Sequence, residues 1–275
     1  MDQARKARGR PRGWDDKTAQ NTIKSLDRAM DVFEHLSETP GATLSAIADN
    51  TEQSPATVYR ILVTLEGKGL VEFDGSTQLW HVGSKAFVIG ARFLRRTGLT
   101  DRARPILRGL MEETGETANL GIERTGSVLF LNQVETQASI RAFFPPGTVS
   151  PMHASGIGKA LLAQMDDDRL ARTLGAAPLE RFTDYTIVDP TALRNDLIRS
   201  RKRGYALDSE DRNLGMRCIA APVFDMNHES VAGVSVSGPT SRVGADDIDR
   251  ISAAVVEAAR ALSTAIGGEG AARKT

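Results

Sequence analysis

The chain has 275 residues, of which 40% are hydrophobic, and its 35 basic and 35 acidic side chains give a formal net charge of zero. This length exceeds one typical domain, and the balanced charge gives no sign of a uniformly basic surface. A single cysteine, Cys218, excludes an intrachain disulfide and a cysteine zinc cluster, and the four histidines lack metal-ligand spacing, so we expect no metal and no cofactor.

Residues 1–20 are predicted to form a flexible basic arm, because residues 1–12 are rich in Arg, Gly and Pro and carry a net charge of +4. Within them, Arg8, Arg10 and Arg12 lie in an Arg-Gly-Arg-Pro-Arg stretch that resembles an AT-hook, a segment that enters narrow A·T-rich minor grooves. The alternative is a solvated tail that is attracted to phosphates alone.

No apolar stretch follows the arm as it would in a secretory signal, and no apolar run reaches the roughly 20 residues that span a bilayer. We therefore expect a cytoplasmic protein without a membrane segment.

Residues 21–84 are predicted to form a winged helix-turn-helix, a DNA-binding unit. A first helix is expected over about 22–38, and two shorter helices follow it within 43–67, each with apolar residues at helical spacing along one face. Ser54 before Pro55 marks the start of the second of these, the reader helix. Two short strands over 70–82 form the candidate wing, and the Asp74-Gly75 turn between them favours positive φ.

The helix-turn-helix body is acidic overall, since residues 13–84 contain five Lys or Arg against eleven Asp or Glu. We expect the basic arm to supply a real share of the attraction to DNA phosphates. In the reader helix, Ser54, Thr57, Tyr59 and Arg60 are the candidate DNA contacts. Arg60 is its only cation before Lys68, although it could equally bind a nearby carboxylate.

Residues 85–115 are predicted to be a linker of one or two helices, with Gly98 and Pro105 as the points where it could break or bend. Such a helix is a natural surface for pairing two subunits on a palindromic operator. A simple spacer is the alternative.

Residues 116–275 change to a mixed α+β pattern without strict β-α-β alternation. Strands are expected over 117–123, 127–135, 139–144, 216–224 and 230–237. Helices are expected at 156–164, at about 190–202 and at 246–266, the last with an apolar stripe.

Four stretches together resemble the IclR family of bacterial transcriptional regulators. They are SLDRAMDVF from Ser25, ATVYRIL from Ala56, MHASGIGKALLA from Met152, and CIAAPVF from Cys218 followed by SVSGP from Ser235. The resemblance implies a C-terminal GAF/PAS-like domain with a mainly antiparallel sheet, which binds a small effector, and a homodimer that assembles to a homotetramer on operator DNA. The chain looks most like the glyoxylate-responsive members, of the allantoin-pathway repressor and β-hydroxyaspartate-cycle types.

The resemblance to the glyoxylate-responsive members implies an effector site at Ser155, Gly156, Ile157, Asp208, Cys218, Ser235 and Ser237. Ser155 would cap a helix whose first amides bind the carboxylate without a cationic side chain, the small glycines allowing a close approach. Ser235 and Ser237 share one face of a strand. Asp208 would accept two hydrogen bonds from hydrated glyoxylate, a gem-diol. Pyruvate and glycolate are alternative effectors.

Each of these residues also has a structural interpretation. Ser155 could be an ordinary helix start, Cys218 a small buried hydrophobe, and Asp208 a cap of the segment after it. The two serines could face water on an edge strand, and His153 is expected to be a structural hydrogen-bonding residue.

An enzyme is the rival class, since Cys218, His153 and Asp208 supply the residue types of a nucleophile, a base and an orienting group. No G-x-S-x-G elbow occurs, the Gly156–Ala160 stretch fails the phosphate-loop pattern, and an enzyme would leave 20–82 without a purpose. We therefore expect no catalytic residue. A purely architectural DNA binder would leave the C-terminal half unexplained.

Overall fold

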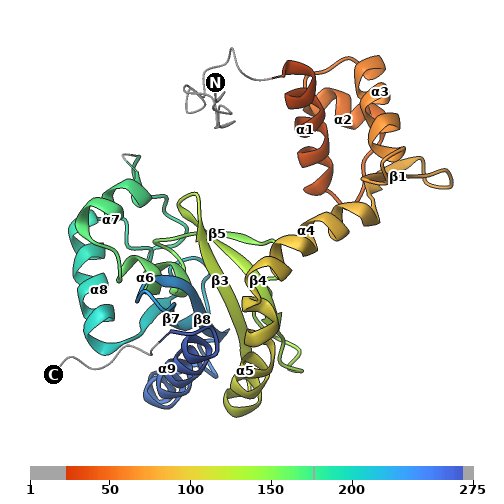
Figure 1. The fold of residues 1–275 in the computed structure, drawn as a ribbon. Coiled ribbons are helices and arrows are strands. Elements are labelled where there is room, and N and C mark those ends of the chain that lie inside the picture. Colours follow the sequence, from red (N-terminus) through yellow and green to blue (C-terminus); the bar gives the residue numbers. More distant parts are fainter. Residues whose placement is uncertain (1–22, 176, 269–275) are drawn as a thin grey trace, which may run out of the picture. The chain divides into compact units, whose positions relative to one another are not determined.

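The computed structural model describes residues 23–175 and 177–268, although not the side chains of residues 91–97. The chain divides into two compact units, Met1–Phe93 and Leu94–Thr275, with the division inside helix α4, Ser84–Thr97 (Figure 1). The predicted arm, with Arg8, Arg10 and Arg12, lies outside the described residues.

The N-terminal unit is the predicted helix-turn-helix with a wing. Its elements are α1, Lys24–Ser37; α2, Leu44–Asn50; α3, Pro55–Glu66; and the antiparallel strands β1, Val71–Asp74, and β2, Leu79–Val82. Val32, Leu36, Ile47, Val58 and Leu62 are fully buried and form the core among the three helices. The apolar positions that the periodicity selected on the reader helix therefore point inward and leave its other face free.

Side chains fix the beginnings of α2 and α3. Thr43 Oγ1 accepts a hydrogen bond from the Ala46 amide at 3.3 Å, and Ser54 Oγ accepts one from the Thr57 amide at 3.2 Å. Each bond satisfies an amide that has no partner within the helix.

The wing turn differs from the sequence-based expectation, because Gln78 (φ 59°), and not Gly75, has positive φ. Asp74 organises the turn: it accepts bonds from the Ser76 amide at 2.8 Å, the Ser76 hydroxyl at 2.7 Å and the Thr77 hydroxyl at 2.8 Å. These bonds lower the pKa of Asp74 to about 2. The longer turn leaves the left-handed residue at its end.

The stretch predicted as a linker is two helices, α4 and α5, Leu99–Thr114, separated by Gly98 in the left-handed region at φ 60°. Pro105 lies inside α5. Ala103, Leu107 and Leu110 of α5 are buried, and the helix packs against α9 and β3. The second half of this stretch therefore belongs to the C-terminal unit.

The C-terminal unit is built on a six-stranded antiparallel sheet of order β5-β4-β3-β8-β7-β6. The strands are β3, Thr117–Arg124; β4, Ser127–Val134; β5, Val149–Pro151; β6, Ala206–Ser209; β7, Met216–Phe224; and β8, Ser230–Pro239. The helices are α6, Gly156–Leu162; α7, Asp167–Leu174; α8, Pro190–Arg203; and α9, Ile248–Ala265, which follows a 3-10 turn at Ala245–Asp247. This is the predicted α+β class with an antiparallel sheet.

The helices of the C-terminal unit lie in two layers. Helices α5 and α9 lie side by side on one face of the sheet, and α6, backed by α8, lies on the other (Figure 1). Among the described residues, the helices include none long and apolar enough to cross a membrane.

The prediction of a strand over 139–144 is wrong. This segment is irregular, and its backbone is held by side chains: Gln133 Nε2 donates to the Ala142 carbonyl at 3.4 Å, and Arg242 Nη2 to that of Ile140 at 2.8 Å. The place beside β4 is taken by β5 instead. Three further elements, β5, α7 and β6, were not predicted from the sequence.

Candidate functional site

Antiparallel register brings three of the predicted effector residues into one row across the sheet. Asp208 on β6 pairs with Cys218 on β7, which pairs with Ser237 on β8. Ser235 lies in the next row on the same face, opposite Asn119 of β3. Because cross-strand partners point to the same side, a carboxyl, a thiol and two hydroxyls face the helix α6 layer.

A small cavity of about 30 Å³ lies between this row and the start of α6. Five of the seven predicted effector residues line it, namely Ser155, Gly156, Asp208, Cys218 and Ser237. The remaining walls are Phe130, Phe144, Ser150, Ala154, Arg212, Asn213, Met216 and Arg217. Since one water-sized sphere takes roughly 10–15 Å³ by this measure, the space suits a molecule of a few non-hydrogen atoms.

Helix α6 approaches the sheet so closely that two of its glycines are required. A Cβ on Gly156 would lie 2.6 Å from Cys218 Sγ, and one on Gly158 would lie 2.1 Å from the Met152 carbonyl oxygen. Ser155 caps this helix by accepting a bond from the Gly158 amide at 3.4 Å. The glycines therefore serve packing at least as directly as they open a path to a ligand.

Ile157 and Ser235 do not line the cavity. Ile157 is fully buried, and its side chain packs against the backbone at Gly121 and Gly233. Ser235 Oγ and Ser237 Oγ each accept a hydrogen bond of 3.3 Å from Asn119 Nδ2. Both serines are buried on the inner strand β8, which rules out the water-facing edge interpretation.

Cys218 is a thiol at neutral pH. Burial, and then the negative charge of Asp208, raise its pKa to about 11, against hydrogen bonds with Ser237 and Ser235 that act in the opposite direction. A protonated thiol in this setting is a poor nucleophile.

Asp208 makes a structural hydrogen bond and also lines the cavity. One carboxyl oxygen accepts the Asp211 amide at 2.9 Å, which is the capping interpretation. Burial, and then the negative charge of Asp211, raise the pKa of Asp208 from 3.8 to about 7, against the opposing charges of Lys159 and Arg212. The group therefore titrates near neutrality while it lines the cavity.

A buried cluster of charged side chains acts on Asp208 through its electric field, and it was not predicted from the sequence. Lys159 of α6 is only 1% exposed, and its Nζ lies 2.5 Å from Asp211 Oδ2 and 3.4 Å from Asp196 Oδ2. Burial raises the pKa of Asp211, while Lys159 lowers it. A lone lysine within the apolar helix Gly156–Leu162 was the available signal.

Two arginines, Arg212 and Arg217, also line the cavity. This corrects the expectation that the site holds an anion without a cationic side chain nearby. Neither residue stands in a motif, and only the folding of the segment after β6 brings them there.

His153 behaves as a structural residue, since its Nε2 is paired with the Glu180 carbonyl at 2.9 Å. Within residues 23–175 and 177–268, no group of His, Cys, Asp and Glu could hold a metal ion.

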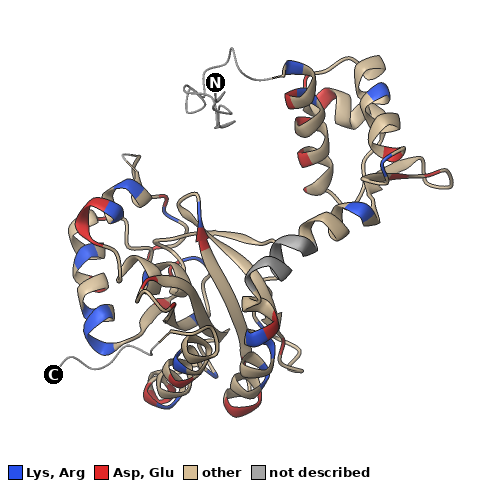
Figure 2. Cartoon of the chain, in the orientation of Figure 1, with Lys and Arg blue, Asp and Glu red and all other residues tan. Residues whose placement is uncertain are grey.

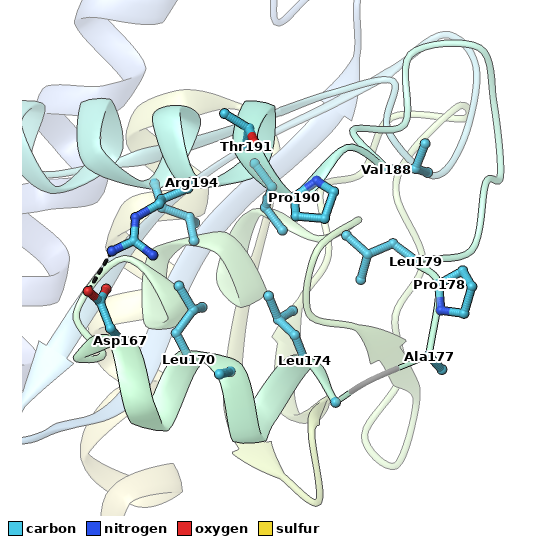
Figure 3. A pocket seen from close by; sticks show the side chains of 14 residues that line it. Asp167, Leu170, Leu174, Ala177, Pro178, Leu179, Val188, Pro190, Thr191 and Arg194 are labelled. Carbon is cyan, nitrogen blue, oxygen red and sulfur yellow. Dashed lines mark ion pairs between the residues drawn. The ribbon is translucent and has the colours of Figure 1, made fainter.

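A larger groove of about 730 Å³ lies between α7 and α8 and is lined mainly by apolar side chains (Figure 3). Asp167 and Arg194 form an ion pair of 2.5 Å on its wall. The groove contains none of the predicted effector residues, so the small cavity is the better candidate for the effector site.

The free face of the reader helix α3 presents the predicted DNA contacts. Tyr59 is 54% exposed, and Arg60, the one basic residue of this helix, is exposed. Among the described residues the Arg60 guanidinium has no carboxylate partner, contrary to the alternative considered for it. Basic and acidic residues alternate along α1 rather than forming one basic face (Figure 2).

Comparisons with known proteins cover both units. The family described as "IclR helix-turn-helix domain" matches residues 25–75, and "Bacterial transcriptional regulator IclR C-terminal" matches residues 91–264.

Whole-chain relatives agree. The chain is 55% identical to the HTH-type transcriptional regulator BhcR of Paracoccus denitrificans over 259 residues, covering 93% of both proteins. It is 35% identical to the HTH-type transcriptional repressor AllR of Klebsiella pneumoniae, covering 94% of this chain and 96% of that protein. The crystal structure of Thermotoga maritima IclR superposes with a TM-score of 0.76 at 30% identity, covering 90% of this chain and all of that one.

Proposed function

The chain belongs to the IclR family of bacterial transcriptional regulators and is a DNA-binding regulator rather than an enzyme. We propose that a small 2-oxo acid, with glyoxylate as the first candidate, controls its operator binding. The observation that carries this proposal is the cavity in which a carboxyl, a thiol, two serine side chains and a helix start converge from α6, β6, β7 and β8. Its small volume favours an effector of glyoxylate size.

In the proposed complex, the effector carboxylate lies at the backbone of Ser155 and Gly156 at the start of α6, and the hydrated aldehyde of the effector donates hydrogen bonds to Asp208. Ser237 and Cys218 complete the polar wall, while Ser235 acts through the Asn119 hydrogen-bond network. A diol offers two hydrogen-bond donors to a carboxylate, so Asp208 would favour glyoxylate hydrate over acids that have no diol.

On the DNA side, Ser54, Thr57, Tyr59 and Arg60 would meet the major groove, and the arm residues Arg8, Arg10 and Arg12 would add phosphate or minor-groove contacts. Two copies would pair so that two reader helices address a palindrome. The apolar side chains of α4 suit such pairing, since Phe87 is 76% exposed and Val88 and Ile89 are exposed as well. Effector binding would then favour one of two states that differ in DNA affinity, in a homodimer or homotetramer working in the cytoplasm.

The direct test is a gel shift of the full chain on the promoter fragment upstream of its own gene, with glyoxylate, pyruvate, glycolate and acetate at matched concentrations. We expect glyoxylate to change the apparent affinity for DNA by several-fold or more. If none of these acids changes it, the effector proposal is wrong.

A variant separates sensing from DNA binding. Asp208→Asn combined with Ser237→Ala should weaken the response to effector and leave the affinity for DNA within about threefold of the wild type. The matched control, Asp184→Ala with Ser241→Ala, changes two exposed residues of the same unit and should preserve both properties. Equal loss of DNA binding and of the response would show a folding role instead.

A further inference from the structure

Arg212 stands out among the residues that line the small cavity. It lies on the segment between β6 and β7, and its guanidinium carbon is 5.3 Å from the centre of the Phe182 ring. Its Nη1 atom is buried and has no hydrogen-bond acceptor among the described residues. A buried guanidinium N–H without an acceptor is costly and rare, so such a group points to a missing partner.

The second arginine of the cavity, Arg217, has hydrogen-bond acceptors within the fold and serves as a comparison. Arg217 Nε donates to Ser209 Oγ at 3.2 Å, and its Nη1 donates to the Val243 carbonyl at 2.6 Å. Arg217 therefore finds its acceptors within the fold, whereas Nη1 of Arg212 does not.

The carboxylates nearest in sequence to Arg212 are already engaged. Asp211 Oδ2 accepts a hydrogen bond from Lys159, and Asp208 Oδ1 accepts one from the Asp211 amide. The face of Phe182 attracts the cation but accepts no strong hydrogen bond. No acceptor among the described residues lies within hydrogen-bond distance of Arg212 Nη1, so a ligand in the cavity could supply one.

The backbone around Arg212 is fixed on both sides. Thr183 Oγ1 donates to the Glu210 carbonyl at 2.7 Å, and Thr186 Oγ1 donates to the Asp211 carbonyl at 2.5 Å. The Gly215 amide donates to Glu210 Oε2 at 2.7 Å. The backbone on both sides of Arg212 is thus fixed, and its guanidinium lies over the Phe182 ring before any ligand arrives, which lowers the entropy lost on binding.

We propose that Arg212 selects the charge of the effector: its unpaired Nη1 donates to a carboxylate oxygen of the small acid in the cavity. This inference rests on the proposed function and adds to it a residue that separates acids from neutral molecules of the same size. A charge-assisted bond from a guanidinium is stronger than a bond between neutral groups, so loss of Arg212 should penalise the acid selectively.

The test measures binding of glyoxylate and of its neutral amide, glyoxylamide, to the full chain by titration calorimetry. Wild type should prefer the acid, and Arg212→Met should weaken glyoxylate binding about tenfold or more while changing glyoxylamide binding by less than about threefold. Arg212→Lys keeps the charge and should retain part of the preference.

The matched control is Arg203→Met, which removes another arginine stacked on an aromatic ring, Tyr205 at 4.6 Å, without touching the cavity. It should leave the ratio of acid to amide affinity unchanged. If Arg212→Met weakens both ligands equally, or neither, Arg212 does not select charge, although glyoxylate sensing stands. If wild type binds no small acid, the proposed function fails and the role of Arg212 fails with it.

Discussion

The two units place their functional residues in opposite ways. In the N-terminal unit the candidate DNA contacts of the reader helix lie within seven consecutive residues, Ser54–Arg60, at the start of α3. In the C-terminal unit the candidate effector residues are spread from Ser155 to Ser237 and meet through strand register and the packing of α6 on the sheet. The residues of a surface that contacts an external partner can be adjacent in sequence, whereas the residues that line a cavity must be brought together by the fold.

The interiors of the two units also differ, in how polar they are. The core of the N-terminal unit consists of apolar side chains such as Val32, Ile47 and Leu62. The C-terminal unit also buries polar residues at or near its cavity, among them Lys159, Asp211, Asn119, Ser235 and Ser237. Its polar interior makes it the more sensitive unit to single changes near the site.

The largest effect is expected from Lys159→Met. The change leaves Asp211 and Asp196 buried without their cation, and breaking a buried ion pair from one side costs about 3–5 kcal/mol. Denaturant unfolding of the full chain should show this loss in the transition of the C-terminal unit.

Lys202→Met is the control for the lysine, since Lys202 is exposed on α8. The free energy of unfolding should change by no more than about 0.5 kcal/mol. A loss below about 1 kcal/mol for Lys159→Met would show that the cluster does not support the unit.

The sequence predicted most of the fold because periodicity and caps are local signals. It located α3, the wing and β7 closely, and missed α7 and the short strands β5 and β6. The two strands have only three and four residues, too few for a clear alternation. It identified Asp208, Cys218 and Ser237 only through family resemblance. Arg212 and Lys159 escaped because their role depends on which segment lies opposite them in space, which no local pattern records.

The next largest effect is expected from Gly158→Ala. The added Cβ would lie 2.1 Å from the Met152 carbonyl oxygen, a backbone atom that cannot turn away. Overpacking of this kind costs about 1–3 kcal/mol. Gly109→Ala on α5 is the matched control, since nothing lies within 4 Å of its new Cβ, and it should be neutral or stabilise the helix slightly. Equal unfolding midpoints for the two variants would mean that α6 can move off the sheet.

A smaller effect is expected from pH on effector binding by the C-terminal unit. With its pKa raised to about 7, Asp208 is mostly ionised at pH 8 and mostly protonated at pH 6. If the carboxylate form accepts the diol of glyoxylate, calorimetric affinity should fall about tenfold between these values. Asp208→Asn should flatten the profile. A wild-type affinity that stays constant, or rises toward pH 6, would show that Asp208 does not bind the diol as an anion.

The raised pKa of Asp208 also predicts the sign of its effect on stability. Its proton is bound more tightly in the folded state, so its contribution to stability is full below the unfolded pKa near 4 and is lost as pH rises through about 7. The unfolding midpoint of Asp208→Asn should therefore depend less on pH over this range than that of the wild type.

The smallest effect concerns Ser54, where a structural cap and a DNA contact coincide in one side chain. Ser54→Ala removes the bond to the Thr57 amide and should cost about 1 kcal/mol in the N-terminal unit. Ser54→Asp keeps an acceptor at the cap and should retain stability, but it places a negative charge beside DNA phosphates and should weaken operator binding more than Ser54→Ala does. If Ser54→Ala weakens DNA binding while Ser54→Asp binds DNA as well as the wild type, Ser54 acts through helix stability alone, and the residues of α3 that contact DNA begin at Thr57.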